Sequence, residues 1–269
     1  MNKGKYLKLF ALFGLSVLLF GCATTGPGGK RSLILISTEQ EVSIGQSMAK
    51  DVESQNKVAD DSVLARYVNG VGQKIAQLSD RTDLSYHFKV LQSPEINAFA
   101  CPGGFIYVYS GLLKTIDNEA QLAGVLSHEI GHVVARHSVK RLQQVLGIQV
   151  LLSIALGESS EITQKAIGAG VTVILQGYSR QNEFEADYDG AYYMTKAGYY
   201  PEGMIQLFGK FQEMEKGRKS TAVDQLLASH PATVDRIARV EEESKSFNLA
   251  NKQLTFGQEE YQKIKSHLK

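Results

Sequence analysis

The chain has 269 residues, of which 43% are hydrophobic and 21% charged, and its formal net charge is +1 at pH 7. That length allows one sizeable domain or two small ones. A nearly neutral charge without a basic cluster argues against nucleic-acid binding driven by counterion release, so we expect a globular chain with no nucleic-acid partner.

The first 22 residues, MNKGKYLKLFALFGLSVLLFGC, have the pattern of a bacterial lipoprotein leader. Lysines precede an apolar run at 9–20 that is too short to span a bilayer comfortably. The run closes in Leu-Phe-Gly-Cys, which resembles a lipobox. We therefore expect a signal peptide at 1–21, lipidation of Cys22, and a lipid anchor and tether at 22–37. The alternative is an ordinary signal peptide followed by an incidental cysteine.

Cys101 is the other cysteine of the chain. If Cys22 carries the lipid, Cys101 has no disulfide partner within the chain, and the domain depends on its core or on a metal for stability. We expect Cys101 to be a small buried residue or a free thiol.

After the tether the chain is mainly helical in pattern. Spaced apolar residues predict helices at 39–57 and 62–79, the second capped by Asp60 or Asp61. Alternating apolar residues predict a strand at 84–92, and NAFA, a Pro-Gly-Gly turn and FIYVY predict a short β-ribbon over 97–109. Six further helices are expected, at 117–136, 139–156, 161–177, 181–197, 202–216 and 231–246.

The fold class that these elements indicate is α+β, mainly α. The stretches 145–156 and 166–175 are apolar, but each is too short to cross a membrane, so we expect them to form a helical hairpin in the core. The last segment, 249–269, is polar, and we expect a C-terminal tail that is loosely attached.

The sequence HEIGH at 128–132 places three polar residues inside an apolar run. On a helix, His128 and His132 lie one turn apart on the same face, which suits two nitrogen ligands of one zinc ion. Glu129 is offset by about 100° and can reach a water on the same ion as a general base. Burying these groups without a partner is costly, so we favour a metal site over a plain core helix. Asp117 is the expected N-cap of this helix.

The third ligand must come from elsewhere in the chain. A three-histidine motif needs a glycine and a histidine where this chain has Ala135 and Ser138. His137 is one residue out of place, and we interpret it as a cation at the end of the helix near Arg136.

A downstream acidic segment, SRQNEFEADYDG, offers the missing carboxylate. Glu183 and Asp187 are four residues apart and share one helical face. Glu183 would then supply the third zinc ligand. Asp187 would accept a hydrogen bond from the ring nitrogen of a ligand histidine that does not bind the ion. Glu185 lies on another face, where we expect it to be solvated or ion-paired.

Four stretches together resemble one family of gluzincin metallopeptidases, that of HtpX and the CAAX prenyl proteases. They are NAFACPGGFIYVYSGLL at 97–113, NEAQLAGVLSHEIGHVVARH at 118–137, EFEADYDG at 183–190 and SHPATVDRI at 229–237. The resemblance covers about residues 38–245. With the lipobox, the chain resembles the bacterial lipoprotein subgroup (LoiP/BepA-like), without tetratricopeptide repeats.

The resemblance implies a zincin-like metallopeptidase domain at 38–248 that binds one Zn²⁺, with Glu183 as the third ligand. It implies that a small β-sheet or ribbon provides the active-site edge strand, to which a peptide adds as an extra strand. The substrate-binding residues of that strand are Asn97, Ala98, Phe99 and Ala100. His230 faces the metal in this family and in some members occupies the fourth coordination position. Arg236 matches a family arginine near the active site.

The function that follows is a zinc-dependent endopeptidase with Glu129 as general base and His230 and Arg236 as further catalytic residues. Its substrates would be unfolded or misassembled cell-envelope proteins, and its lipid would anchor it to the membrane, expected to be the outer membrane facing the periplasm. The alternative is a zinc-stabilised periplasmic chaperone or assembly scaffold with latent or no proteolysis. The sequence gives no indication of the oligomeric state.

Overall fold

The computed structural model describes residues 22–25, 27, 30–216, 228–230, 234–247 and 253–268. The expected signal peptide at 1–21 lies outside the described residues. The helices are α2 (Thr38–Gln55), α3 (Ser62–Ala76), α4 (Ser110–Thr115), α5 (Glu119–Val134), α6 (His137–Leu146), α7 (Ile148–Ala155), α8 (Glu161–Leu175), α9 (Arg180–Lys196), α10 (Glu202–Lys216), α12 (Val234–Ser244) and α13 (Gln258–Lys265). The strands are β1 (Cys22–Thr25), β2 (Lys30–Leu33), β3 (His87–Leu91), β4 (Ala98–Cys101) and β5 (Phe105–Tyr109), and short 3-10 turns follow as η1 (Pro102–Gly104) and η2 (Lys245–Phe247).

A small sheet has the strand order β3-β5-β4. β4 and β5 pair antiparallel across the Pro102–Gly104 turn, as the ribbon pattern predicted, with Ala98 opposite Val108. β3 pairs with β5 in parallel. β4 therefore lies at the edge of this sheet, and the expected α+β, mainly α, zincin-like fold is confirmed.

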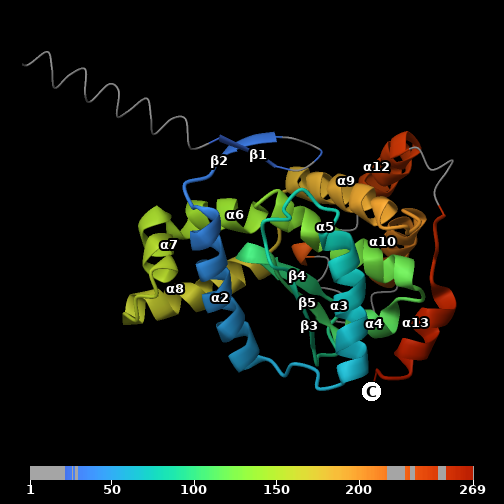
Figure 1. Cartoon of the computed structure of the whole chain (residues 1–269), viewed down its shortest axis with the longest axis horizontal. Helices are drawn as coiled ribbons and strands as arrows, with labels where there is room; N and C mark the ends of the chain where they lie inside the picture. The colour runs from blue at the N-terminus through green and yellow to red at the C-terminus, as the bar shows by residue number, and fades with distance from the viewer. Residues whose placement is uncertain are drawn as a thin grey trace, which may run out of the picture.

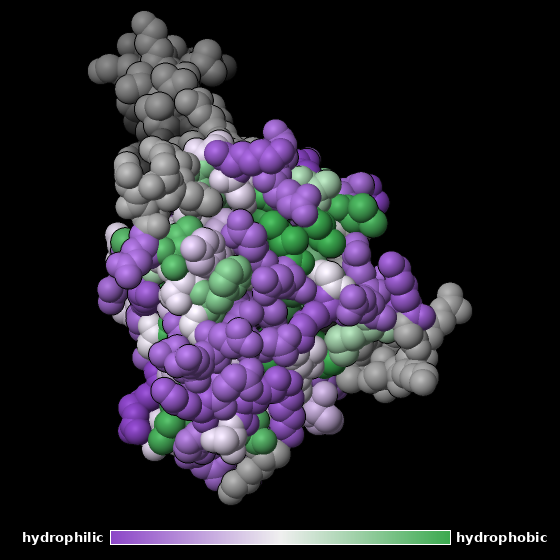
Figure 2. Space-filling view, turned by 90° about the vertical axis from the view of Figure 1, so that its right-hand side faces the viewer, coloured by the Kyte–Doolittle hydropathy of each residue, from purple (hydrophilic) through white to green (hydrophobic). Residues whose placement is uncertain are grey.

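The core is organised around α5, in which every residue from Ala120 to Val134 is buried. α5 packs against α9, α10 and α3, and it also contacts β4. Figure 1 shows α2, α6, α7 and α8 on one side of the sheet, and α10, α12 and α13 on the other. The latter face of the molecule is mainly hydrophilic, with a hydrophobic patch in its upper half (Figure 2).

The expected apolar hairpin forms part of the core. Buried Leu151 and Ile154 of α7 and Ile174 of α8 belong to one hydrophobic cluster with α2 and the sheet. The pattern predicted one helix at 139–156, but Gly147, with φ at +80°, separates α6 from α7. Among the described helices, none is both long and apolar enough to cross a membrane.

Helix boundaries follow local capping, with one correction. The Asp61 side chain accepts hydrogen bonds from the first turn of α3, as predicted. At α5 the N-cap is Asn118 and not Asp117, because the Asn118 side chain accepts the Gln121 N–H at 2.9 Å. The Asp117 carboxylate instead pairs with Lys210 at 2.5 Å.

Both ends of the described chain make more contacts than their composition indicated. In the expected tether, β1 and β2 form an antiparallel ribbon with Cys22 opposite Leu33. The expected loose tail was wrong for residues 253–268. There Tyr261 is buried and donates a hydrogen bond to the Leu113 carbonyl, and the Thr255 N–H bonds to Gly198. A single large aromatic side chain thus docks an otherwise polar helix.

Candidate metal centre

The residues proposed as metal ligands meet where α5 and α9 cross. His132 Nε2 lies 3.3 Å from Glu183 Oε1, and His128 Nε2 lies 3.5 Å from Glu183 Oε2. The two histidine Nε2 atoms are 3.0 Å apart. The i, i+4 spacing on α5 and the first turn of α9 thus bring together the residues that the sequence placed fifty positions apart.

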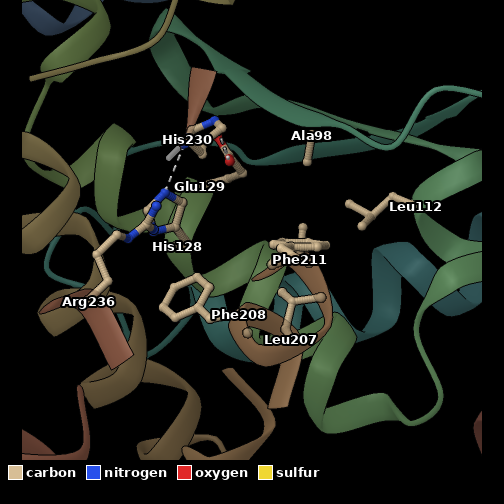
Figure 3. A pocket seen from close by; sticks show the side chains of 11 residues that line it. Ala98, Leu112, His128, Glu129, Leu207, Phe208, Phe211, His230 and Arg236 are labelled. Atoms are coloured by element: carbon tan, nitrogen blue, oxygen red, sulfur yellow. Dashed lines mark hydrogen bonds and ion pairs between the residues drawn. The ribbon is translucent and has the colours of Figure 1, made fainter. Parts of the chain in front are cut away.

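His230 completes a group of four. Its Nδ1 atom lies 3.1 Å from Glu183 Oε2 and 3.2 Å from His128 Nε2, and Figure 3 shows its ring beside His128 and Glu129. One ligand atom from each of His128, His132, Glu183 and His230 lies within 4.8 Å of the others. Imidazole nitrogens and a carboxylate at this spacing fit the donor set and the four-coordinate geometry of zinc.

Arg236 contacts the carboxylates beside this group and also lines the cavity next to it. Its Nε and Nη2 atoms each donate to the Asp187 carboxylate at 2.7 Å, and its Nη1 lies 2.9 Å from Glu183 Oε2. Asp187 Oδ1 in turn lies 2.9 Å from His128 Nδ1, as the sequence predicted. Arg236 therefore holds both carboxylates in place, and its side chain is 2% exposed.

The expectation for His137 was wrong. We expected a helix-end cation near Arg136, but His137 is fully buried and its Nδ1 lies 2.9 Å from Nδ1 of His132. The reason is that Arg136 adopts a left-handed conformation, φ 53° and ψ 34°, which turns the chain inward between α5 and α6. Glu185, which we expected to be either solvated or ion-paired, is buried and lies with its Oε2 3.5 Å from His137 Nε2.

Glu129 is the acid positioned beside the ligands. It is 2% exposed, its Oε1 lies 3.7 Å from His230 Nε2, and its Oε2 has no hydrogen-bond partner among the described residues. Burial raises the pKa of Glu129, although the nearby His230 and His128 oppose that shift. A carboxylate with one free acceptor atom and a raised pKa suits a group that accepts and returns a proton.

The charges around the ligands are strongly coupled. Burial disfavours the ionised form of Glu183, but His230 and Arg236 outweigh burial and hold the pKa of Glu183 well below its usual value. Burial likewise opposes protonation of His128, but hydrogen bonds to Asp187 and Glu183 raise its pKa to about 9. Glu183 is therefore ionised over the whole neutral range, as a metal ligand must be.

The segment expected to form the edge strand begins next to the ligands. Asn97 is buried, its Oδ1 accepts the Ala98 N–H at 2.9 Å, and its Nδ2 has no partner among the described residues. The Ala100 carbonyl, two residues on, accepts a hydrogen bond from Ser138 Oγ at 3.0 Å. Phe99 points to the other side, where its ring stacks 5.2 Å from that of Tyr107.

Tyr178 is a site residue that the sequence analysis missed. Its ring stacks on His132 with centroids 4.2 Å apart, and its hydroxyl lies 2.9 Å from Ser138 Oγ. No motif marks a tyrosine at this position, because its role comes only from the path of the loop between α8 and α9.

An apolar cavity opens beside the candidate ligands and Glu129. His128, Glu129 and His230 form one wall, and Figure 3 shows aromatic and aliphatic side chains opposite them. The apolar lining consists of Ala98, Leu112, Val125, Leu207, Phe208 and Phe211. The cavity thus joins the start of the edge strand to the metal centre.

Comparison with known proteins agrees with this geometry. The sequence profile described as Peptidase family M48 matches residues 62–244. The chain is 28% identical to the Beta-barrel assembly-enhancing protease of Escherichia coli (strain K12) over 214 residues, which is 76% of this chain and 43% of that protein. It is 26% identical to the Metalloprotease LoiP of the same organism over 249 residues, 88% of this chain and 96% of that protein.

A eukaryotic protein is also similar to this chain. The Mitochondrial metalloendopeptidase OMA1 of Schizosaccharomyces pombe is 33% identical over 179 residues, 65% of this chain and 52% of that protein. The chain thus spans less than half of the Beta-barrel assembly-enhancing protease but nearly all of LoiP.

Proposed function

Because the chain belongs to peptidase family M48, we propose that it is a zinc-dependent endopeptidase that cleaves unfolded or misassembled proteins of the cell envelope. One observation carries this proposal: the ligand atoms of His128, His132 and Glu183 converge, and the buried carboxylate of Glu129 lies beside them.

In the proposed reaction, His128, His132 and Glu183 hold the zinc ion. When bound, the ion would supply the acidity that lets water ionise near neutral pH and the charge that polarises the scissile carbonyl. Glu129 accepts the proton of the attacking water on its free Oε2 and returns it to the leaving amine. Asp187 and Arg236 keep the ligands oriented, since both contact a ligand directly.

We infer that the polypeptide binds along Asn97–Ala100. An extended peptide that pairs with an edge strand gains backbone hydrogen bonds with little sequence preference, which suits varied unfolded substrates. The unpartnered Nδ2 of buried Asn97 is a donor available to such a peptide. The apolar cavity beside Glu129 would take one of its side chains.

His230 is proposed to have two roles. Its contact with Glu183 at 3.1 Å supports a role as a fourth zinc ligand, which would keep the resting enzyme latent. Displaced by substrate, the same ring is close enough to Glu129 to donate a hydrogen bond to the developing oxyanion. Arg236 adds positive charge beside the ligands.

The envelope location is also part of the proposal. The lipobox-like sequence ending in Cys22 supports a lipid anchor. Similarity to the Beta-barrel assembly-enhancing protease supports outer-membrane proteins as the substrate class and the periplasmic face of the outer membrane as the site of action.

The test is Glu129→Gln, which keeps the size and hydrogen-bonding capacity of the side chain but removes the base. We expect the variant to contain one zinc per chain, as the wild type does, and to lose cleavage of unfolded casein. His132→Ala, the matched control, should lose both zinc and cleavage. Wild-type cleavage by Glu129→Gln would refute the mechanism.

The second candidate is a zinc-stabilised chaperone or assembly scaffold. The position of His230 against Glu183 favours it, because an occupied fourth position gives little proteolysis. His230→Ala separates the two. A latent protease changes its rate of casein cleavage when His230 is removed, whereas a scaffold is inert with either residue.

A further inference from the structure

The two histidines of the HEIGH sequence are held from behind by different groups. His128 Nδ1 lies 2.9 Å from Asp187 Oδ1, and carboxylates are common behind ligand histidines. His132 Nδ1 instead lies 2.9 Å from Nδ1 of His137. The proposed function gives His137 no role, although its imidazole is fully buried against a proposed ligand.

His137 reaches His132 because the helix is broken between them. Five residues along an unbroken helix would put the two rings on different faces. Here the left-handed Arg136 turns the chain, and its guanidinium is fixed by Glu41 Oε2 at 2.8 Å. A strained conformation held by a buried ion pair indicates that the position of His137 is fixed by the fold and not by chance.

The hydrogen bond between the rings determines where each proton lies. Two imidazole nitrogens at 2.9 Å share one proton, so one ring donates and the other accepts. His132 Nε2 faces Glu183 at 3.3 Å and His128 at 3.0 Å, where a ligand nitrogen needs a free lone pair. The proton of His132 is then on Nδ1 and is donated to His137. The proton of His137 is on Nε2, which faces Glu185 Oε2 at 3.5 Å.

We propose that His137 is a positioning residue that fixes the tautomer and the orientation of His132. This inference rests on the proposed function, because it concerns one of the ligands assigned there. Stacking on Tyr178 sets the plane of the His132 ring, and His137 sets which nitrogen faces the metal centre. Both histidine rings are 0% exposed, so water cannot replace His137 unless the core opens.

The tautomers can be measured on the wild-type full chain without any variant. Long-range proton–nitrogen correlation spectra of the zinc-loaded protein distinguish rings protonated on Nδ1 from rings protonated on Nε2. We expect His132 to carry its proton on Nδ1 and His137 to carry its proton on Nε2. A His137 ring protonated on Nδ1 would overturn the proposal, because that ring could not accept the hydrogen bond.

The variant that tests the consequence is His137→Phe, which keeps a ring but removes both nitrogens. We expect zinc affinity, measured by competition with a chromophoric chelator, to fall about 10- to 100-fold. His137→Gln restores an acceptor and should recover most of that loss. His87→Phe is the matched control, because His87 is an exposed residue of β3 that stacks on Phe105 and should leave the affinity unchanged.

The outcomes separate this inference from the proposed function. Equal zinc affinity in wild type and folded His137→Phe would overturn the role of His137 alone. A wild-type chain that binds no zinc would refute the proposed function instead. If His137→Phe does not fold, the wild-type tautomers and the zinc affinity of His137→Gln decide the question. We expect His137 Nδ1 to be unprotonated and His137→Gln to bind zinc nearly as tightly as wild type. Far weaker zinc binding by His137→Gln would overturn the proposal.

Discussion

A Cβ atom on Gly131 would lie 2.8 Å from the carbonyl oxygen of Ala186, so the backbones of α5 and α9 touch where the metal centre is built. Gly190 makes the reciprocal contact, since its Cβ would lie 2.9 Å from the backbone nitrogen of His128. Side chains on two helices this close can meet, as the 3.3 Å between His132 Nε2 and Glu183 Oε1 shows.

We therefore expect Gly131→Ala to destabilise the protein, although alanine is the better helix former. The added methyl must push backbone aside, and overpacking of this kind costs about 1–3 kcal/mol. Gly70→Ala is the matched control: nothing lies within 4 Å of its Cβ position on α3, so the substitution should stabilise by about 0.5–1 kcal/mol. Urea denaturation measures both, and stabilisation by Gly131→Ala would contradict the close helix contact.

The sequence predicted the candidate ligand pairs because their spacing follows the helix period. His128 and His132 lie on one face of their helix wherever that helix packs, and the same holds for Glu183 and Asp187. What spacing cannot supply is the contact between the two helices, which depends on Gly131 and on the path of distant segments. The antiparallel pairing of β4 with β5 was likewise predictable from the turn between them. The edge position of β4 was expected only from the family resemblance, and the parallel pairing of β3 with β5 was not predicted.

Arg236→Leu should destabilise the metal-free protein strongly. Arg236 is 2% exposed and contacts both Asp187 and Glu183, so its removal leaves two buried carboxylates without their cation. Breaking such a buried pair costs about 3–5 kcal/mol. Arg239→Leu provides the control, because the Arg239 side chain is 48% exposed and that of its partner Glu243 is 24% exposed, and a pair this exposed contributes less than about 1 kcal/mol. Similar losses in the two variants would show that the buried pairing is unimportant.

The same contacts set a pH dependence. Burial opposes ionisation of Asp187, but Arg236 outweighs it and holds the pKa of Asp187 below its ordinary 3.8. A group with a lowered folded-state pKa contributes stability that is present above the unfolded-state pKa and lost as pH falls through the folded-state value. The free energy of unfolding of the metal-free wild type should therefore fall below about pH 4. The corresponding fall should be smaller in Arg236→Leu. Parallel declines of both proteins between neutral pH and pH 3 would contradict this coupling.

His137 and the C-terminal segment could not be predicted for physical reasons. His137 follows an arginine shortly after HEIGH, a pattern typical of a solvated helix end. The sequence does not reveal that Arg136 adopts a left-handed conformation and pairs with buried Glu41. The polar composition of 253–268 conceals Tyr261, whose one buried ring docks α13. In both cases a single tertiary contact overrides the local pattern.

Cys101 should be unreactive in the folded protein. Its thiol is 0% exposed, and burial raises its pKa, so little thiolate forms and none of it is accessible. Iodoacetamide at pH 8 should modify Cys101 only after the protein is unfolded in urea. Peptide mapping by mass spectrometry assigns the label and distinguishes Cys101 from Cys22. Rapid labelling of Cys101 under native conditions would place the thiol outside the core.

The apolar cavity should give the proposed peptidase a preference for a bulky apolar side chain next to the scissile bond. Phe211 is 4% exposed and lines the cavity together with Phe208. Phe211→Ala removes part of that wall, and a change of this size in a hydrophobic pocket alters kcat/KM by about 10- to 200-fold. We expect kcat/KM to fall for peptides with leucine or phenylalanine at that position and to stay nearly constant for alanine.

Profiling with a peptide library measures this selectivity. Phe184→Ala is the control, because the Phe184 ring lies under the Arg239 guanidinium at 4.3 Å on α9 and is not part of the cavity lining. If Phe211→Ala lowers kcat/KM equally for every peptide, the side chain supports the fold or the chemistry and does not select substrates. If the loss is confined to bulky apolar residues, the cavity holds the side chain adjacent to the bond that Glu129 helps to cleave.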